Sequence, residues 1–262
     1  MEVSWRPERG ETPTPRTVHP ASPGRSAEDE IIRLMGRHKV LHCLTQDDLR
    51  SLVRQSALLW FRERELIFSQ GEEGRSVLAV VQGYVKLSSS TEGGREVVLE
   101  LAGPGNVFGE LAVLNGWRRS ADAYALTACQ LLSIEARLFT QTIARVPEAM
   151  FGLFRVLSRR LRQANEQVTD SVDLPGPQRL AKAFIKLAAL SSHPVADGLQ
   201  IDLQLSQREL GAMTGLTRES INKHLSGWRD EGLIRLSDRA ITLLDLHALK
   251  LNKVQGCEAG LD

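Results

Sequence analysis

The sequence predicts an α+β chain built from an antiparallel β-barrel or jelly roll, one long helix, and a small C-terminal domain of helices and a hairpin. Three observations predict this order. Short apolar runs alternate with glycine turns from about residue 57 to residue 137. A heptad-like apolar pattern follows from residue 147 to residue 172. Near the C-terminus, two helix start signals flank a glycine turn and precede two short strand-like runs.

Composition indicates a globular protein and excludes several classes. Of the 262 residues, 33 are Lys or Arg and 32 are Asp or Glu, so the net charge is only +1. Nucleic-acid binding would therefore need a local patch rather than a basic coat. No apolar run reaches the length of a membrane span, and the N-terminus lacks the apolar core of a secretory signal. The three cysteines form no CxxC pair and no disulfide framework, which favours the cytoplasm.

Four segments follow from the distribution of proline, glycine and apolar residues. Residues 1–28 hold five of the ten prolines among polar residues, so we expect a disordered tail. Residues 29–146 are expected to form N-terminal helices, with Thr45 capping one of them, and then the barrel. Residues 147–173 are expected to form the long helix, and residues 174–262 the C-terminal domain.

The barrel strands are predicted from short apolar runs. A glycine turn at residues 92–94 separates two of them and predicts a hairpin. The predicted strand cores are Leu66–Phe68, Val77–Val81, Tyr84–Leu87, Val97–Leu101 and Gln130–Ile134.

The long helix starts at Pro147 and carries one apolar seam. The seam consists of Phe154, Leu157, Leu161, Ala164 and Val168, spaced by 3, 4, 3 and 4 residues. Such a helix can pack on its own barrel or pair with a second copy, and the regular spacing favours a homodimer. The segment Asp173–Pro177 breaks the helix and is a candidate hinge between two domains.

The C-terminal domain shows the pattern of a winged helix-turn-helix. Ser206 and Glu209 form a capping box, Gly215 suits a tight turn, and Thr217 is the next candidate cap. Residues 233–236 and 240–243 then predict a hairpin wing, in which Arg235 or Arg239 could touch phosphate.

The second helix of this motif has two distinct faces. Ile221, Leu225 and Trp228 recur at helical spacing and are expected to face the core. A polar face at its N-terminal end is expected to meet DNA, where Arg can bind guanine and Glu can accept from cytosine. The alternative is a solvated helix surface. The candidate DNA-binding residues are Ser206, Gln207, Thr217, Arg218, Glu219, Asn222 and Lys223.

These motifs resemble the winged helix-turn-helix of the CRP/FNR family of bacterial transcription regulators. The resemblance rests on Gln207–Gly211 and Thr217–Ser220. It implies an Arg-Glu pair at the start of the recognition helix, here Arg218 and Glu219, and a basic residue four positions after the Glu, here Lys223. It further implies a palindromic, TGTGA-like DNA site and contact with RNA polymerase. Many members carry Arg where this chain has Lys223.

A second motif lies in the barrel, between Phe108 and Ala121. It offers a carboxylate, a guanidinium, a hydroxyl, a glycine that allows close approach of a ligand, and a short helix starting near Glu110. The string resembles the phosphate-binding cassette of cyclic-nucleotide-binding domains. By that resemblance Arg119 and Ser120 bind the cyclic phosphate and Glu110 binds the ribose 2′-hydroxyl. The matching residues are Gly109, Glu110, Leu111, Ala112, Arg119, Ser120 and Ala121.

The resemblance leaves the effector open. In cAMP-responsive members two adjacent hydroxyl residues of the long helix contact adenine, whereas the matching positions here are Ala164 and Asn165. Asn165 can bond a base edge, and the candidate effectors are cAMP, cGMP and cyclic di-GMP. The alternatives are an empty pocket in which Glu110 pairs with Arg119, a DNA-binding regulator whose barrel is a redox, gas or haem sensor or is constitutive, and an enzyme using the barrel as a phosphate site.

We expect neither enzymatic activity nor a metal site. His38, His42 and Cys43 have helical metal-ligand spacing but no second ligand pair nearby, and a single cysteine in this region argues against an iron–sulfur cluster. The sequence therefore predicts a cytoplasmic, homodimeric transcription regulator controlled by a cyclic nucleotide.

Overall fold

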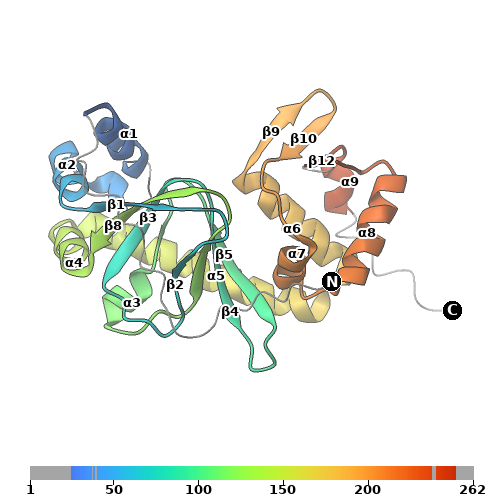
Figure 1. Cartoon of the computed structure of the whole chain (residues 1–262), viewed down its shortest axis with the longest axis horizontal. Coiled ribbons are helices and arrows are strands. Elements are labelled where there is room, and N and C mark those ends of the chain that lie inside the picture. Colours follow the sequence, from blue (N-terminus) through green and yellow to red (C-terminus); the bar gives the residue numbers. More distant parts are fainter. Residues whose placement is uncertain (1–24, 37, 39, 238–239, 252–262) are drawn as a thin grey trace. The chain divides into compact units, whose positions relative to one another are not determined.

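The computed structural model describes residues 25–36, 38, 40–237 and 240–251 (Figure 1). These residues form two compact units. The first unit runs to Val85 and resumes at Pro104–Arg145. The second comprises Lys86–Gly103 and the chain from Val146 onward. Among the described residues, no helix combines the length and the apolar character needed to cross a membrane.

The first unit opens with three short helical segments, α1 (Arg25–Met35), η1 (Leu41–Cys43) and α2 (Gln46–Arg54). The predicted helical stretch therefore starts at Arg25, inside the segment expected to be a tail, while residues 1–24 lie outside the described part. Thr45 caps α2 as expected, because its side chain accepts from Asp48 N and the Asp48 carboxylate bonds back to Thr45 N.

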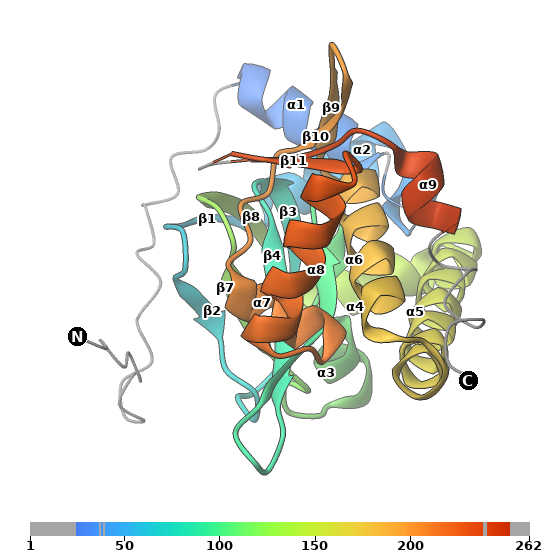
Figure 2. The ribbon, with the colours of Figure 1, turned by 90° about the vertical axis from the view of Figure 1, so that its right-hand side faces the viewer.

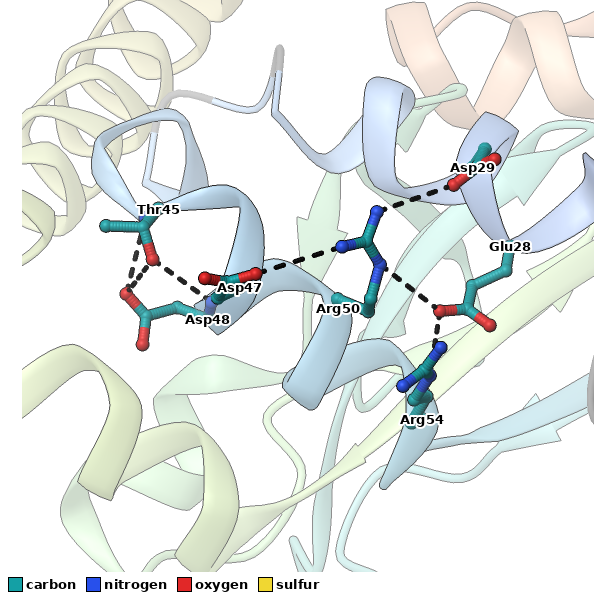
Figure 3. Close-up of polar contacts among 7 residues, drawn as sticks. All are labelled: Glu28, Asp29, Thr45, Asp47, Asp48, Arg50 and Arg54. Atoms are coloured by element: carbon teal, nitrogen blue, oxygen red, sulfur yellow. Dashed lines mark hydrogen bonds and ion pairs between the residues drawn. The ribbon is translucent and has the colours of Figure 1, made fainter. Parts of the chain in front are cut away.

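Ion pairs hold α1 against α2 (Figure 3). Glu28 is 8% exposed and its Oε1 lies 2.9 Å from Arg54 Nε and 3.7 Å from Arg50 Nε. Arg50 also approaches Asp29 and Asp47, at 3.7 and 3.8 Å. Buried Ile31, Ile32, Leu49 and Leu52 supply the apolar contact between these helices.

Antiparallel strands make up the centre of the first unit. The strands are β1 (Ala57–Phe61), β2 (Leu66–Phe68), β3 (Ser76–Gln82), β6 (Val107–Phe108), β7 (Asp122–Ala125) and β8 (Cys129–Glu135). One sheet has the order β1-β8-β3-β6, and β2 pairs with β7. In that sheet Val77 faces Ile134 in register and both are fully buried. The sequence missed β1, β6 and β7, whereas β2, β3 and β8 contain the predicted runs.

Two helices complete the first unit, α3 (Glu110–Asn115) and α4 (Ala136–Arg145). α3 is the short helix expected near Glu110. α4 was not predicted from the sequence; it follows β8 directly and buries Phe139 and Ile143.

The second unit begins at Lys86, within β4 (Val85–Ser90), and contains the hairpin that this strand forms with β5 (Glu96–Ala102). Its turn contains the predicted glycines, and Gly94 adopts φ +74, a left-handed conformation that glycine adopts without steric cost. Lys86 Nζ lies 2.6 Å from Glu96 Oε1 within the hairpin, and Arg160 Nε lies 2.9 Å from Glu100 Oε2.

The long helix α5 (Pro147–Asp173) has the predicted length, with Pro147 in its first turn. It buries Ala149, Leu153 and Val156 but leaves another face exposed. The exposed apolar residues of α5 are Phe151, Phe154, Leu161, Val168 and Val172, with 58–80% of their surface accessible. After a break at Leu174 and Pro175, α6 (Gly176–Leu190) begins, and Pro177 lies in its first turn rather than in the break.

The C-terminal domain combines helices with one antiparallel sheet (Figure 2). Its elements are β9 (Ser192–Val195), β10 (Gly198–Ile201), α7 (Gln207–Thr214), α8 (Arg218–Asp230), β11 (Ile234–Leu236), β12 (Ile241–Leu243) and α9 (Leu246–Leu251). The sheet order is β11-β12-β10-β9, so the wing predicted from β11 and β12 continues into a hairpin that the sequence analysis missed. α6, α7 and α8 contact one another, and Phe184 meets Trp228 edge-on at 6.0 Å.

Candidate ligand site and nucleic-acid interface

Arg119 is the centre of the cassette in the first unit. It lies between α3 and β7, and the residue is only 6% exposed. Its Nη1 donates to the carbonyl oxygen of Gly109 and its Nη2 to that of Ser76, both at 2.8 Å. The guanidinium carbon lies 4.2 Å from the centre of the Phe68 ring, so the cation also contacts an aromatic face.

The charge of Arg119 is not neutralised by an ion pair with any described residue. Its Nε is buried without a hydrogen-bond partner in the described part of the chain. Burial lowers the pKa of Arg119, and the charges of Glu72 and Glu110 offset part of that effect. An arginine stays protonated at physiological pH even so, because its ordinary pKa lies far above neutrality. The cassette therefore holds a buried cation with an unused donor.

The backbone around Arg119 is pinned by the loop between β2 and β3. Arg119 N donates to the carbonyl oxygen of Glu72 at 2.7 Å, and Gly71 N donates to that of Arg119 at 2.9 Å. Gly74 approaches α3 so closely that an added Cβ would lie 2.2 Å from Cβ of Ala112. Ala112 is thus buried against this loop, where a larger side chain would clash.

The other predicted ligand residues differ in exposure. Glu110 is 2% exposed at the start of α3, and Gly109 precedes it with φ +80. Ala121 is buried, whereas Leu111 and Ser120 are exposed. Asn165 is exposed on α5, in the second unit. Gly109, Glu110 and Arg119 thus come together in the first unit, since Arg119 bonds Gly109 and feels the charge of Glu110.

Sequence reasoning missed two contacts of Arg119. Ser76 binds it through a main-chain oxygen, so the residue type carries no signal. Phe68 lies in a strand that was predicted, but its position beneath the guanidinium depends on the packing of distant segments.

The second candidate site is the helix-turn-helix of α7 and α8. Ser206 caps α7 by accepting from Glu209 N, and the Glu209 carboxylate accepts from Ser206 N, which is the predicted capping box. Gly215 ends α7 with φ +72, and the Thr217 side chain accepts from Ser220 N at the start of α8. These local rules fix the turn between the two helices.

The two predicted faces of α8 are confirmed. Ile221, Leu225 and Trp228 are buried. The opposite side exposes Arg218, Glu219, Asn222 and Lys223. Burial and then the charge of Lys223 lower the pKa of His224, so the positive charge of this helix end comes from Arg218 and Lys223.

Gln207 is the first residue of α7, and its side chain touches two of the predicted DNA-binding side chains on α8. Its Oε1 accepts from Arg218 Nε at 2.7 Å, and its Nε2 donates to Asn222 Oδ1. In the wing, Arg235 pairs with Asp197, and Arg239 lies outside the described residues. Among the described residues, no three His, Cys, Asp or Glu side chains lie close enough together to hold a metal ion.

A barrel with a buried arginine, followed by a winged helix-turn-helix, defines a DNA-binding regulator with a ligand-sensing domain. Residues 58–146 match the family model of the cyclic nucleotide-binding domain, and residues 178–251 match that of the Crp-like helix-turn-helix domain. The chain belongs to the CRP/FNR family of transcription regulators.

Curated relatives and solved structures agree with this assignment. The chain is 31% identical over 199 residues to the cyclic AMP receptor protein of Thermus thermophilus, covering 74% of this chain and 89% of the relative. It is 29% identical over 221 residues to a CRP-like cAMP-activated global transcriptional regulator of Mycobacterium tuberculosis, covering 84% and 97%. A CRP-family transcriptional regulator from Thermus thermophilus superposes with a TM-score of 0.64 at 29% identity, covering 77% of this chain and 99% of that structure.

Proposed function

We propose that this regulator binds palindromic DNA as a homodimer under the control of a cyclic nucleotide held in the barrel. The observation that carries the proposal is the buried guanidinium of Arg119, which forms no ion pair with a described residue and whose Nε has no hydrogen-bond partner among them. Leaving such a group buried costs free energy unless a partner compensates it. A singly charged phosphodiester would supply the missing charge and acceptors.

The remaining cassette residues have roles that suit the same ligand. Ser120 is exposed beside Arg119 and offers a hydroxyl to a phosphate oxygen. Glu110 offers a carboxylate that accepts from a ribose 2′-hydroxyl, and Asn165 offers an amide to the base edge. Two curated relatives bear names that refer to cyclic AMP, which favours a cyclic mononucleotide. The positions that would contact adenine are Ala164 and Asn165, so the choice among cAMP, cGMP and cyclic di-GMP requires measurement.

Dimerisation and DNA binding complete the proposal. The exposed apolar face of α5 repeats every seven residues at Phe154, Leu161 and Val168, as in a two-helix seam. Two copies paired there would present two recognition helices to the half-sites of a palindrome, for which a TGTGA-like sequence is the first candidate. The break at Leu174 and Pro175 would serve as the hinge that couples the two functions. We place this regulator in the cytoplasm, with RNA polymerase as its further partner.

Calorimetric titration of the full chain with cAMP, cGMP and cyclic di-GMP tests the proposal. One of the three should bind, and Arg119→Ala should abolish that binding. Arg118→Ala is the matched control, because Arg118 is an exposed neighbour that donates to the Gly71 carbonyl oxygen. Thermal melts establish that both variants fold. If a folded protein free of co-purified ligand bound none of the three, the nucleotide proposal would fail, and a haem, redox or constitutive mode would remain for the same DNA-binding protein.

A further inference from the structure

The side chain of Gln207 connects the first helix of the DNA-binding motif to the recognition helix. Gln207 is the first residue of α7, and it is half-buried, whereas Arg218 and Asn222 on α8 are exposed. The amide accepts a hydrogen bond from Arg218 Nε and donates one to Asn222 Oδ1. One neutral side chain thus orients two residues of the face that is expected to meet DNA.

Arg218 keeps only part of its hydrogen-bonding capacity in this arrangement. Its Nε is taken by Gln207 at 2.7 Å, while its Nη1 and Nη2 bond to no described residue. The free end of the guanidinium presents two parallel N–H groups. This pair matches the O6 and N7 acceptors that guanine exposes in the major groove.

For Asn222, the atom occupied by Gln207 is the acceptor of the side chain, whereas for Arg218 it is a donor. An asparagine pairs with adenine through two bonds, donating to N7 and accepting from N6. In this protein Asn222 Oδ1 already accepts from Gln207 Nε2, so Nδ2 is the group left for DNA. With its oxygen already engaged, the amide offers mainly its Nδ2 donors, which suit guanine, the O4 of thymine or a phosphate oxygen. The two-bond pair with adenine would need the second lone pair of Oδ1 and is disfavoured.

We propose that Gln207 is a specificity-determining residue that acts through its neighbours. It holds Arg218 end-on for guanine and turns Asn222 so that adenine is disfavoured at the adjacent base pair. Gln207 is therefore a positioning residue, whose removal changes sequence preference more than overall affinity. This inference rests on the proposed binding of a specific DNA sequence.

The test starts with the full chain, assayed alone and with cAMP, cGMP or cyclic di-GMP added in turn, and a pool of randomised palindromic half-sites. The selected site and all its single-base variants are then compared in competition binding at one fixed salt concentration. Gln207→Ala removes the hydrogen bonds that orient Arg218 and Asn222. The preference for guanine opposite Arg218 should then fall by roughly tenfold, which is within the discrimination between bases that a two-bond pair provides. Binding to random DNA should change little, because Gln207 carries no charge to release counterions.

Gln207→Glu gives a second and opposite signature. A carboxylate can still accept from Arg218 Nε, so the guanine preference there should persist. It cannot donate to Asn222, whose amide must turn to donate from Nδ2 and present Oδ1 outward. The preferred base at that step should then shift from one offering an acceptor, guanine or thymine, toward one offering a donor, adenine or cytosine.

Gln204→Ala is the matched control, since Gln204 is an exposed glutamine just ahead of α7 and should leave the selected sequence unchanged. A uniform loss of affinity for all sequences in Gln207→Ala, with the guanine preference intact, would mean a simple phosphate contact and would overturn the inference. Retention of the wild-type preferences in both Gln207 variants would overturn it as well. A wild-type protein without any sequence preference would refute the proposed specific binding itself, and the inference with it.

Discussion

Gly109 and Arg119 are matched to each other, since Arg119 Nη1 donates to the Gly109 carbonyl oxygen at 2.8 Å and fills the space that a side chain at Gly109 would need. A Cβ added to Gly109 would lie 2.4 Å from that same Nη1. Gly109 also adopts φ +80, a conformation that residues with a Cβ rarely take. The glycine thus permits both the turn and the buried position of the guanidinium.

Gly109→Ala should therefore impair both stability and ligand binding. The left-handed backbone alone costs about 1–2 kcal/mol for a residue with a Cβ. The clash also displaces Arg119 from its place over Phe68, so nucleotide affinity should fall by roughly tenfold or more, the equivalent of one lost hydrogen bond to a charged group. Denaturant unfolding and calorimetric titration measure the two effects.

Gly94→Ala separates the cost of a left-handed backbone from the effect of a clash with Arg119. Gly94 has a similar φ of +74, but an added Cβ there would meet nothing within 4 Å. This variant should lose comparable stability and bind nucleotide normally. If Gly109→Ala and Gly94→Ala bound nucleotide with equal affinity, the position of the Arg119 guanidinium would not depend on Gly109.

Leu161→Glu should convert the protein to a monomer. Leu161 is 64% exposed on α5, one heptad after Phe154 and one before Val168. Burying a leucine against a partner helix stabilises association by about 1.5–3 kcal/mol per side chain, and a dimer would contain two copies. A glutamate at this place would instead put two charges into the seam. Sedimentation velocity over a range of protein concentrations reports the change.

Gln163→Glu provides the control for charge alone, because Gln163 is exposed on the side of α5 opposite the seam. It should leave the oligomeric state unaltered. A Leu161→Glu protein that sediments like the wild type would contradict the assignment of this face to the dimer.

Local sequence rules predicted much of the fold. The bounds of α5 follow from Pro147 at its start and from the break after Asp173, and the caps Thr45, Ser206 and Thr217 follow from side-chain hydrogen bonds to the next turn. β1 (Ala57–Phe61) is an apolar run that was not singled out, whereas the other strands that escaped prediction are short or polar. β6 has two residues, and β9 contains a histidine and a proline. Such strands are defined by their partners in the sheet and not by a periodic pattern of their own.

The candidate sites were predictable in residue type and less so in contacts. The cassette string pointed to Arg119, but its acceptors are main-chain oxygens of Gly109 and of Ser76, which lies 43 positions away. The polar face of α8 was evident from helical spacing. Its link to Gln207 spans 11 and 15 positions and arises only when α7 packs against α8. Contacts between distant segments depend on tertiary packing, which a periodicity argument does not reach.

Lys223→Ala should weaken binding to the selected DNA site by 1–3 kcal/mol, roughly 5- to 150-fold, while binding to random DNA falls far less. Lys223 is exposed on α8 on the same face as Arg218 and Glu219, where a recognition helix meets base edges. Competition assays at matched salt concentration give both affinities.

Arg229→Ala is the corresponding control at the other end of α8, where Arg229 Nη2 lies 2.9 Å from Asp230 Oδ1. Its removal should not alter sequence preference. If Lys223→Ala instead reduced specific and random binding by the same factor, Lys223 would be a phosphate contact.

The pair of Lys86 and Glu96 should make the stability of the β4–β5 hairpin depend on acid pH. Burial raises the pKa of Glu96, but the hydrogen bond and charge of Lys86, a hydrogen bond with Ser88 and the charge of Arg208 together lower it by more, so the pKa lies below its usual 4.5. The folded state therefore favours the ionised carboxylate. Its contribution is fully present above pH 4.5 and is lost as the pH falls through the lower folded-state pKa. Glu96→Gln should cost about 1.5–3 kcal/mol at neutral pH, as expected for a hydrogen bond between charged groups, and progressively less as the pH falls below 4.5.

Glu73→Gln tests whether an ion-paired carboxylate must be buried to contribute to the pH-dependent stability. The pKa of Glu73 is also lowered, by its hydrogen bond to Arg75, but this pair is fully accessible to solvent. Water and salt screen such exposed pairs, so the substitution should not change the midpoint of urea unfolding measurably at any pH. Lys86 and Glu96, by contrast, retain only 10% and 17% of their side-chain exposure. Unfolding midpoints of Glu96→Gln that track those of the wild type from neutral to acid pH would show that the buried pair contributes no more than the exposed one.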